Sequence, residues 1–256
     1  MELTQAGRRL LELSERVVLA ADELKLSARA MKGEISGKLR IGTLSDPHFI
    51  RLGEFLGRAL ESYPLLELEL QNSITATALA HVKDGTLEAS FYFGELAESG
   101  VESLALSKMD YCIAAPAAWA ARIRDAGWEA IAQMPWVLPP EASIINRQVR
   151  SVFREHGVEL NTHIEADNES VIANLIGSGV GVSLMREDLA RNQQRAGVVC
   201  IWEGALLPTT LRFIWLRERN GDRAIQALVA LLRETWGLAP AAPVRRPSIL
   251  RKRVST

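Results

Sequence analysis

Hydroxyl, amide and carboxylate side chains follow three predicted strands of this chain, at residues 43–48, 72–76 and 93–95. In a parallel sheet, ligands bind at the carboxyl ends of the strands, beside the N-termini of the helices that follow. The backbone amides at such helix starts are free and can hold an anion. These three segments therefore predict one wall of a small-molecule site.

Other arrangements of reactive residues do not support catalysis, metal binding or a cofactor. The four histidines lack the spacing of metal ligands, and there are no paired carboxylates and no nucleophile–base arrangement. Gly177–Gly181 follows a helix and precedes a strand, the reverse of the dinucleotide fingerprint, and it lacks the lysine of a phosphate loop. We therefore interpret these glycines as a tight turn and expect no catalytic residues, no metal and no cofactor.

The two cysteines, Cys112 and Cys200, lie on predicted strands and form no disulfide framework. A redox pair is the alternative, but burial as free thiols is the simpler interpretation.

A helix is predicted directly after the strand at residues 38–43. Asp46 can accept hydrogen bonds from the free amides of the first turn, and Pro47 suits the first helical position. Capping is the simpler role for Asp46; contact with a ligand is the alternative and would suit an amine. Apolar residues then recur at helical spacing and define the predicted buried face: Phe49, Leu52, Leu56 and Leu60.

The pattern continues with an alternating strand at residues 66–70, a helix at 75–83 and a strand at 87–93. Strand–helix–strand–helix–strand predicts a parallel α/β sheet covered by helices.

The rest of the chain carries further elements of both kinds. The expected strands are 101–115, 136–138, 161–166, 182–185, 198–202 and 211–216, and the expected helices are 119–133, 147–156, 167–176 and 222–236.

Residues 3–31 repeat apolar residues at heptad spacing, with Leu3, Leu10, Val17, Leu24 and Met31 in one register. A period that stays at 3.5 residues favours a coiled coil and hence a dimer. An amphipathic helix lying on its own domain is the alternative.

Composition is that of a soluble globular protein of 256 residues, with 48% hydrophobic and 24% charged residues and a formal net charge of −1. The body of the chain therefore has no charge bias toward nucleic acid. An apolar run of bilayer length and a secretory signal pattern are both absent from the sequence, so we expect a cytoplasmic protein without membrane contact.

Several short motifs together resemble the LysR-type transcriptional regulators. They are Leu3-Thr4-Gln5-Ala6-Gly7, Gly37-Lys38-Leu39-Arg40-Ile41-Gly42, Tyr63-Pro64, Asp84-Gly85-Thr86-Leu87-Glu88 and Ile176-Gly177-Ser178-Gly179-Val180-Gly181-Val182. Each is weak alone, but their order and spacing match from residue 3 to about residue 236.

The resemblance implies two Rossmann-like subdomains of the type 2 periplasmic-binding-protein fold, preceded by a long linker helix. The chain would leave the first subdomain, build the second and return. The implied division is a linker and dimerisation helix at 1–36, subdomain I at 37–108 and 207–237, subdomain II at 109–206, and a disordered basic tail at 238–256.

The resemblance also implies an effector site in the cleft between the subdomains. Its candidate residues are Ser45, His48, Ser73, Thr75, Phe93, Ser143, Arg147 and Asn168. Helix capping by Ser73 and Thr75, a core position for Phe93 and a surface position for Arg147 are the alternatives to ligand contact.

The implied function is that of the ligand-sensing and oligomerisation region of a regulator, without catalysis. A small effector, an organic acid or an amino acid, would bind in the cleft, and the chain would form a homodimer or homotetramer. The family's winged helix-turn-helix precedes the first motif, where this chain begins, so we expect DNA contact only through that missing domain. A solute-binding protein for transport and an enzyme on a similar two-lobed fold are the alternatives.

Overall fold

The computed structural model describes residues 35–72 and 75–239, and side chains at positions 75 and 76 are outside that description. The heptad segment 3–31 and the tail from residue 240 onward lie outside the described residues. The coiled-coil and tail interpretations therefore remain predictions.

A parallel sheet opens the described chain, as predicted. Strand β1 (Ser36–Thr43) pairs in parallel with β2 (Leu65–Asn72) and with β3 (Ala89–Phe93). The connections are the helices α2 (Leu52–Ser62) and α3 (Thr75–Lys83). The carboxyl ends of β1 and β3 therefore lie next to each other in the sheet.

The prediction for α2 was wrong in two respects. Residues 47–51 form turns, and the helix begins only at Leu52, after Arg51 has adopted a left-handed φ of 50°. The buried face centres on Phe55 and Ala59, while Leu60 is 59% exposed. The other predicted residues of the stripe, Phe49, Leu52 and Leu56, are partly buried and pack against the same apolar core, so only Leu60 was assigned to the wrong side.

Two long strands carry the chain across the molecule and back. Strand β4 (Val101–Pro116) pairs antiparallel with β8 (Val199–Leu216) along most of its length. The prediction of separate strands at 198–202 and 211–216 was wrong. The register shifts between the pairs Cys112–Leu206 and Ile113–Trp202, so β8 carries residues 203–205 as a bulge without ending.

The chain between β4 and β8 folds into short elements. These are η1 (Ala117–Trp119), α4 (Ala120–Ile123), α5 (Trp128–Ala132), β5 (Trp136–Leu138), α6 (Ile144–Glu155), β6 (Thr162–Glu165), α7 (Glu169–Gly177), β7 (Ser183–Arg186) and α8 (Glu187–Arg195). Helix α8 was not predicted, because its sequence is almost entirely polar and only Leu189 and Ala190 are apolar. Strands β5 and β6 pair in parallel as a separate small sheet.

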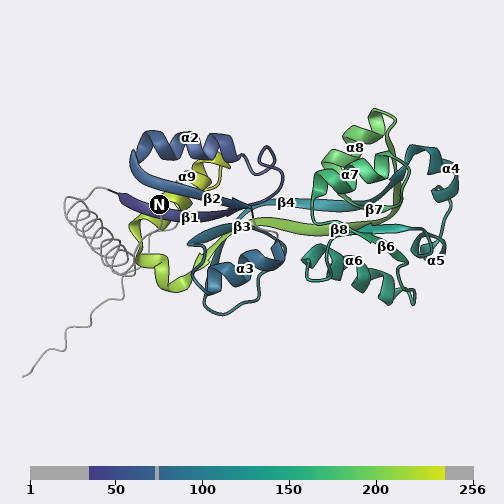
Figure 1. Cartoon of the computed structure of the whole chain (residues 1–256), viewed down its shortest axis with the longest axis horizontal. Coiled ribbons are helices and arrows are strands. Elements are labelled where there is room, and N and C mark those ends of the chain that lie inside the picture. The colour runs from purple at the N-terminus through teal and green to yellow at the C-terminus, as the bar shows by residue number, and fades with distance from the viewer. Residues whose placement is uncertain (1–34, 73–74, 240–256) are drawn as a thin grey trace, which may run out of the picture.

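The main sheet has the strand order β2-β1-β3-β8-β4-β7 and serves two lobes (Figure 1). The first lobe comprises β1, β2, β3, α2, α3 and α9 (Arg223–Thr235), and α9 follows the short helix η2 (Arg217–Gly221). The second lobe comprises the elements from η1 to α8. Strands β4 and β8 run from one lobe into the other.

Each lobe has its own apolar core. Phe55, Phe91 and Phe213 meet edge to face in the first lobe, and α9 covers them with Ile225 and Leu228. In the second lobe, the rings of Trp136 and Phe153 pack at 5.4 Å between centroids. Met109 on β4 packs against both of these cores.

The glycine-rich turn after α7 is a packing feature, as predicted. Gly179 has a left-handed φ of 86°, and a side chain on Gly181 would collide with the carbonyl oxygen of Pro135. Close approach of two backbones therefore explains Gly181 without a nucleotide.

Candidate functional site

The loop after β1 is built around Asp46. Its Oδ1 accepts hydrogen bonds from the amides of His48 (3.1 Å) and Phe49 (3.0 Å), so the predicted capping role is confirmed, although it closes a turn rather than α2. Arg51 then anchors the loop on α9, where its Nη1 donates to the carbonyl of Thr235 at 2.8 Å. These contacts hold the loop at the carboxyl end of β1.

The other oxygen of Asp46 reaches the second lobe. Arg186, the last residue of β7, places its Nη1 2.9 Å from Asp46 Oδ2 and its guanidinium 3.7 Å from the centroid of the Phe49 ring. The Arg186 side chain is only 5% exposed. An ion pair between this buried arginine and the partly exposed Asp46, and a cation–π contact, thus join the two lobes.

Arg186 is shared among three carboxylates. Besides Asp46, its Nε lies 3.0 Å from Asp188 and its Nη1 lies 3.6 Å from Glu169. Burial alone would lower the pKa of Arg186, but the hydrogen bond that it donates to Asp188 and the charge of Glu169 outweigh burial and raise that pKa. The guanidinium therefore stays charged at any physiological pH.

The same surroundings shift the two carboxyl groups in opposite directions. Burial would raise the pKa of Asp46, yet the amide of Phe49 and the guanidinium of Arg186 lower it. Burial dominates at Glu169 and raises its pKa, despite the attraction of Arg186. Asp46 is a fixed anion, whereas Glu169 is easier to protonate than an ordinary glutamate.

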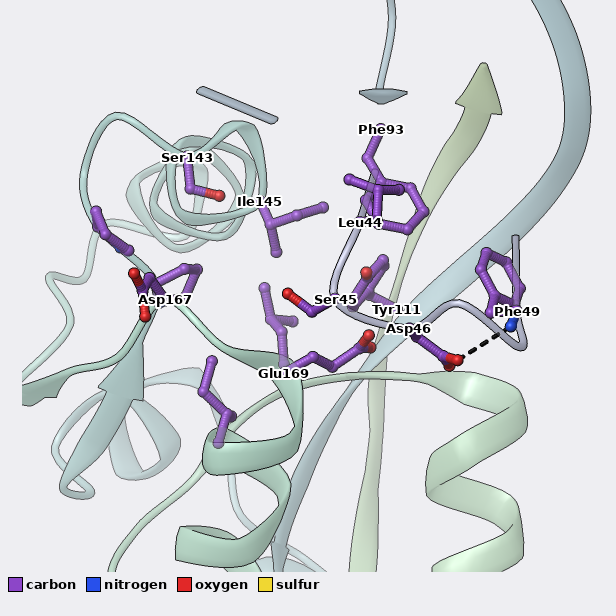
Figure 2. A pocket seen from close by; sticks show the side chains of 14 residues that line it. Leu44, Ser45, Asp46, Phe49, Phe93, Tyr111, Ser143, Ile145, Asp167 and Glu169 are labelled. Atoms are coloured by element: carbon purple, nitrogen blue, oxygen red, sulfur yellow. Dashed lines mark hydrogen bonds between the residues drawn. The ribbon is translucent and has the colours of Figure 1, made fainter. Parts of the chain in front are cut away.

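A cavity of about 100 Å³ lies beside this network, between the two lobes (Figure 2). Its walls come from the loop after β1, from β3 and β4, from the start of α6, and from the start of α7. The lining residues are Leu44, Ser45, Asp46, Phe49, Phe93, Tyr111, Pro139, Pro140, Ser143, Ile145, Asp167, Glu169, Ile172 and Leu184.

Several polar groups of the cavity lack a partner among the described residues. Glu169 Oε1 is buried without a hydrogen bond. Tyr111 is 6% exposed, and its environment, burial above all, raises the pKa of the phenol well above its usual range, so the hydroxyl stays protonated. Ser45 and Ser143 add two more hydroxyls (Figure 2). The arrangement can bind a small polar molecule with an apolar part.

Three of the predicted site residues line this cavity, namely Ser45, Phe93 and Ser143. The alternative for Phe93 holds at the same time, since its ring is buried in the first lobe's core. Asp46 likewise both caps a turn and faces the cavity.

The other predicted residues lie elsewhere. His48 lines a larger groove of about 760 Å³, which shares Ser45, Asp46 and Glu169 with the cavity. Arg147 lies on α6 in a separate groove beside Arg150.

Three predicted site residues remain: Asn168, Thr75 and Ser73. Asn168 caps α7, where its Oδ1 accepts from the amides of Ser170 and Val171. Thr75 opens α3, but its side chain is outside the described part, as is Ser73 entirely. Ligand contact by any of the candidates stays a prediction.

Sequence analysis missed three residues that shape the site: Tyr111, Glu169 and Arg186. Tyr111 was assigned only to a strand, and Glu169 only to the acidic first turn of a helix. Arg186 ends an apolar strand, and a charged residue at the carboxyl end of a strand is the one signal that pointed to it.

Both cysteines are free and buried, as predicted. Burial raises the pKa of the Cys112 thiol to about 12. The Cys200 thiol donates to the carbonyl of Pro116 at 3.1 Å. Neither thiol is activated toward oxidation.

Within residues 35–72 and 75–239, no group of three or more His, Cys, Asp or Glu residues has a geometry that could hold a metal ion. No described helix has the length and apolar character needed to cross a membrane.

A family model, the LysR substrate binding domain, matches residues 32–237. This chain belongs to that family. One relative of this chain is the HTH-type transcriptional regulator YofA of Bacillus velezensis. The two are 24% identical over 191 residues, which are 75% of this chain and 64% of YofA. The chain thus spans just under two thirds of the length of YofA.

Solved structures of LysR-type domains share the fold. The effector-binding domain of QuiR in complex with shikimate matches 79% of this chain and 98% of its own, with a TM-score of 0.65 and 13% identity. The regulatory domain of Synechocystis PCC6803 CcmR in complex with 2-PG matches 80% and 100%, also at a TM-score of 0.65 and at 14% identity. The fold is therefore the expected α/β fold of the type 2 periplasmic-binding-protein kind.

Proposed function

We propose that the cavity between the lobes is the effector site of this LysR-type domain. The observation that carries the proposal is that both lobes line it: Ser45 and Phe93 come from the first lobe, and Ser143 from the second. A molecule that touches both walls gains binding energy only when the lobes close on it. Its binding would therefore favour one closure angle of β4 and β8.

We further propose that this closure controls transcription in a whole protein that reads DNA through a separate helix-turn-helix domain. The relatives named as HTH-type transcriptional regulators support this role and favour it over a transport protein. Association into a homodimer or homotetramer, cytoplasmic location and the absence of catalysis belong to the same proposal. So does the division into subdomain I at 37–108 and 207–237 and subdomain II at 109–206.

An organic acid or an amino acid suits the polar rim of the cavity. The start of α6 presents free backbone amides there, because Ser143 makes no side-chain cap. The hydroxyls of Ser45 and Ser143 can add hydrogen bonds to a carboxylate.

The test is a thermal-shift and calorimetry screen of a metabolite panel on the whole chain, followed by a variant that fills the cavity. Ser143→Phe places a ring at the start of α6 without removing a cap. Ser151→Phe is the matched control, on the exposed side of the same helix. We expect Ser143→Phe to abolish binding of a hit and Ser151→Phe to leave it unchanged.

Two outcomes would contradict the proposal. One is that no member of the panel binds. The other is that a hit binds Ser143→Phe as tightly as the wild type, which would locate its site elsewhere.

A further inference from the structure

Glu169 is the most unusual acidic group of the cavity. It is the first residue of α7, and its side chain reaches toward the loop that carries Ser45 and Asp46 (Figure 2). Oε2 lies 3.6 Å from Arg186, at the outer limit of an ion pair, while the buried Oε1 has no hydrogen-bond partner among the described residues. A buried carboxylate oxygen without a donor is costly, so a donor is expected to come from a ligand.

The charges around the cavity favour a cation. Asp46, Asp167 and Glu169 line it, and its lining includes no Lys, Arg or His among the residues described. Arg186 lies next to these carboxylates but does not line the cavity, and its hydrogen bonds go to Asp46 and Asp188. The carboxylates therefore outnumber the available cations at this point of the molecule.

A second group points to a ligand independently of the acidic residues. Tyr111 is more than nine-tenths buried and lines the cavity, and its hydroxyl makes no hydrogen bond within the described part of the chain. A phenol oxygen can accept a hydrogen bond from an ammonium group while its proton is donated elsewhere.

The remaining wall is apolar and the space is small. Leu44, Phe93, Ile145 and Ile172 face the cavity. Its volume of about 100 Å³ is below that of a cavity that holds benzene, which is about 150 Å³. A single ammonium group on a short apolar chain matches this combination.

We propose that the effector carries a protonated amine, that the carboxylate of Glu169 receives it, and that its apolar part lies against Phe93 and Ile145. The proposal rests on the proposed function and narrows its ligand class. An amino acid satisfies it, with its carboxylate at the start of α6, whereas an organic acid without an amine does not.

The direction of the pH dependence distinguishes these ligand classes. An ammonium group binds the ionised form of Glu169, so its affinity should rise with pH through the raised pKa of that residue. A plain carboxylate would bind better to the protonated form, so its affinity should fall. Charged or titratable groups that also face Glu169 come from the neighbouring elements: Asp46, His48, Tyr111, Asp167, Arg186 and Asp188.

The experiment uses three related probes: norvaline, butylamine, which is norvaline without its carboxylate, and pentanoate, which is norvaline without its amine. Binding of each to the whole chain is measured by calorimetry at a series of pH values from about 4.5, in the usual pKa range of Glu, to about 8.5, below that of Lys. We expect butylamine and norvaline to bind, with higher affinity at higher pH, and pentanoate not to bind.

Two variants assign the effect to the site. Glu169→Gln keeps the shape of the side chain and should weaken butylamine and norvaline by about tenfold to a hundredfold. Glu165→Gln on β6, which is exposed and outside the cavity, should leave both unchanged. Tyr111→Phe should also weaken both, and it keeps the test decisive if Glu169→Gln does not fold.

Binding of pentanoate alone would overturn the amine proposal and leave the effector cavity standing. Binding of none of the probes, or amine binding that survives both Glu169→Gln and Tyr111→Phe, would also overturn it. The panel screen and Ser143→Phe decide separately whether the cavity is an effector site.

Discussion

Two arginines five positions apart carry similar sets of partners in different surroundings. Arg186 at the end of β7 meets Asp46, Glu169 and Asp188, and its side chain is 5% exposed. Arg191 on α8 meets Glu187 (3.2 Å) and Glu203 (2.8 Å), and its side chain is 38% exposed. The two arginines differ in their burial and in the lobe to which their partners belong.

The contribution of an ion pair to stability therefore depends on where the pair lies in the fold. Water screens the Arg191 pairs, which lie within one lobe, and exposed pairs of this kind contribute little. Arg186 is only 5% exposed, so water can hardly replace a lost partner, and Asp46 belongs to the opposite lobe. Of these two arginines, Arg186 is therefore the one that can couple stability to lobe closure.

The largest expected effect comes from Arg186→Met. Removing the guanidinium leaves partly buried carboxylates of Asp46 and Glu169 without a cation, and such a change costs about 3–5 kcal/mol of unfolding free energy. Chemical denaturation at neutral pH measures it. A loss below about 1 kcal/mol would place Arg186 in the same class as an exposed arginine.

Asp46→Asn should have an intermediate effect. Asparagine still caps the turn through its side-chain oxygen, so mainly the charged contact to Arg186 is lost, at about 1–2 kcal/mol. Denaturation gives this value, and small-angle scattering of the same samples reports lobe opening. An unchanged scattering profile together with unchanged stability would show that the contact does not hold the lobes together.

Glu169→Gln should have a smaller effect that depends on pH. Because the folded state raises the pKa of Glu169, it binds the proton more readily than the unfolded state, so wild-type stability falls as pH rises through that window. The variant should then be more stable than the wild type at about pH 8, by less than about 1 kcal/mol, and no more stable at about pH 3.5. Melting curves at both pH values measure the difference. A variant that is less stable at the higher pH would mean that Arg186 stabilises the ionised carboxylate more than burial opposes it.

Arg191→Met should have the smallest effect. Its partners are exposed, Glu203 at 65%, so the change should alter the unfolding free energy by about 0.5 kcal/mol or less. Raising the salt concentration should remove what effect there is, since salt screens exposed charges. A loss comparable to that of Arg186→Met would break the comparison.

Several elements in both lobes were predictable because their signals are local. The alternation in β2, the cap before α7 and the apolar side of α9 follow from neighbouring residues alone. The break before α2, the continuity of β8 and the polar helix α8 were not predictable, because packing between distant segments overrides or replaces local periodicity there.

Motif order and helix-start chemistry were enough to predict the α/β class, the order of most elements and three residues that line the cavity, Ser45, Phe93 and Ser143. The contact of Arg186 with Asp46, and the place of Tyr111 and Glu169 in the cavity, arise only in the folded chain. The physical reason is distance along the chain. Arg186 and Asp46 are 140 residues apart, and no local pattern records which charges two returning strands will bring together.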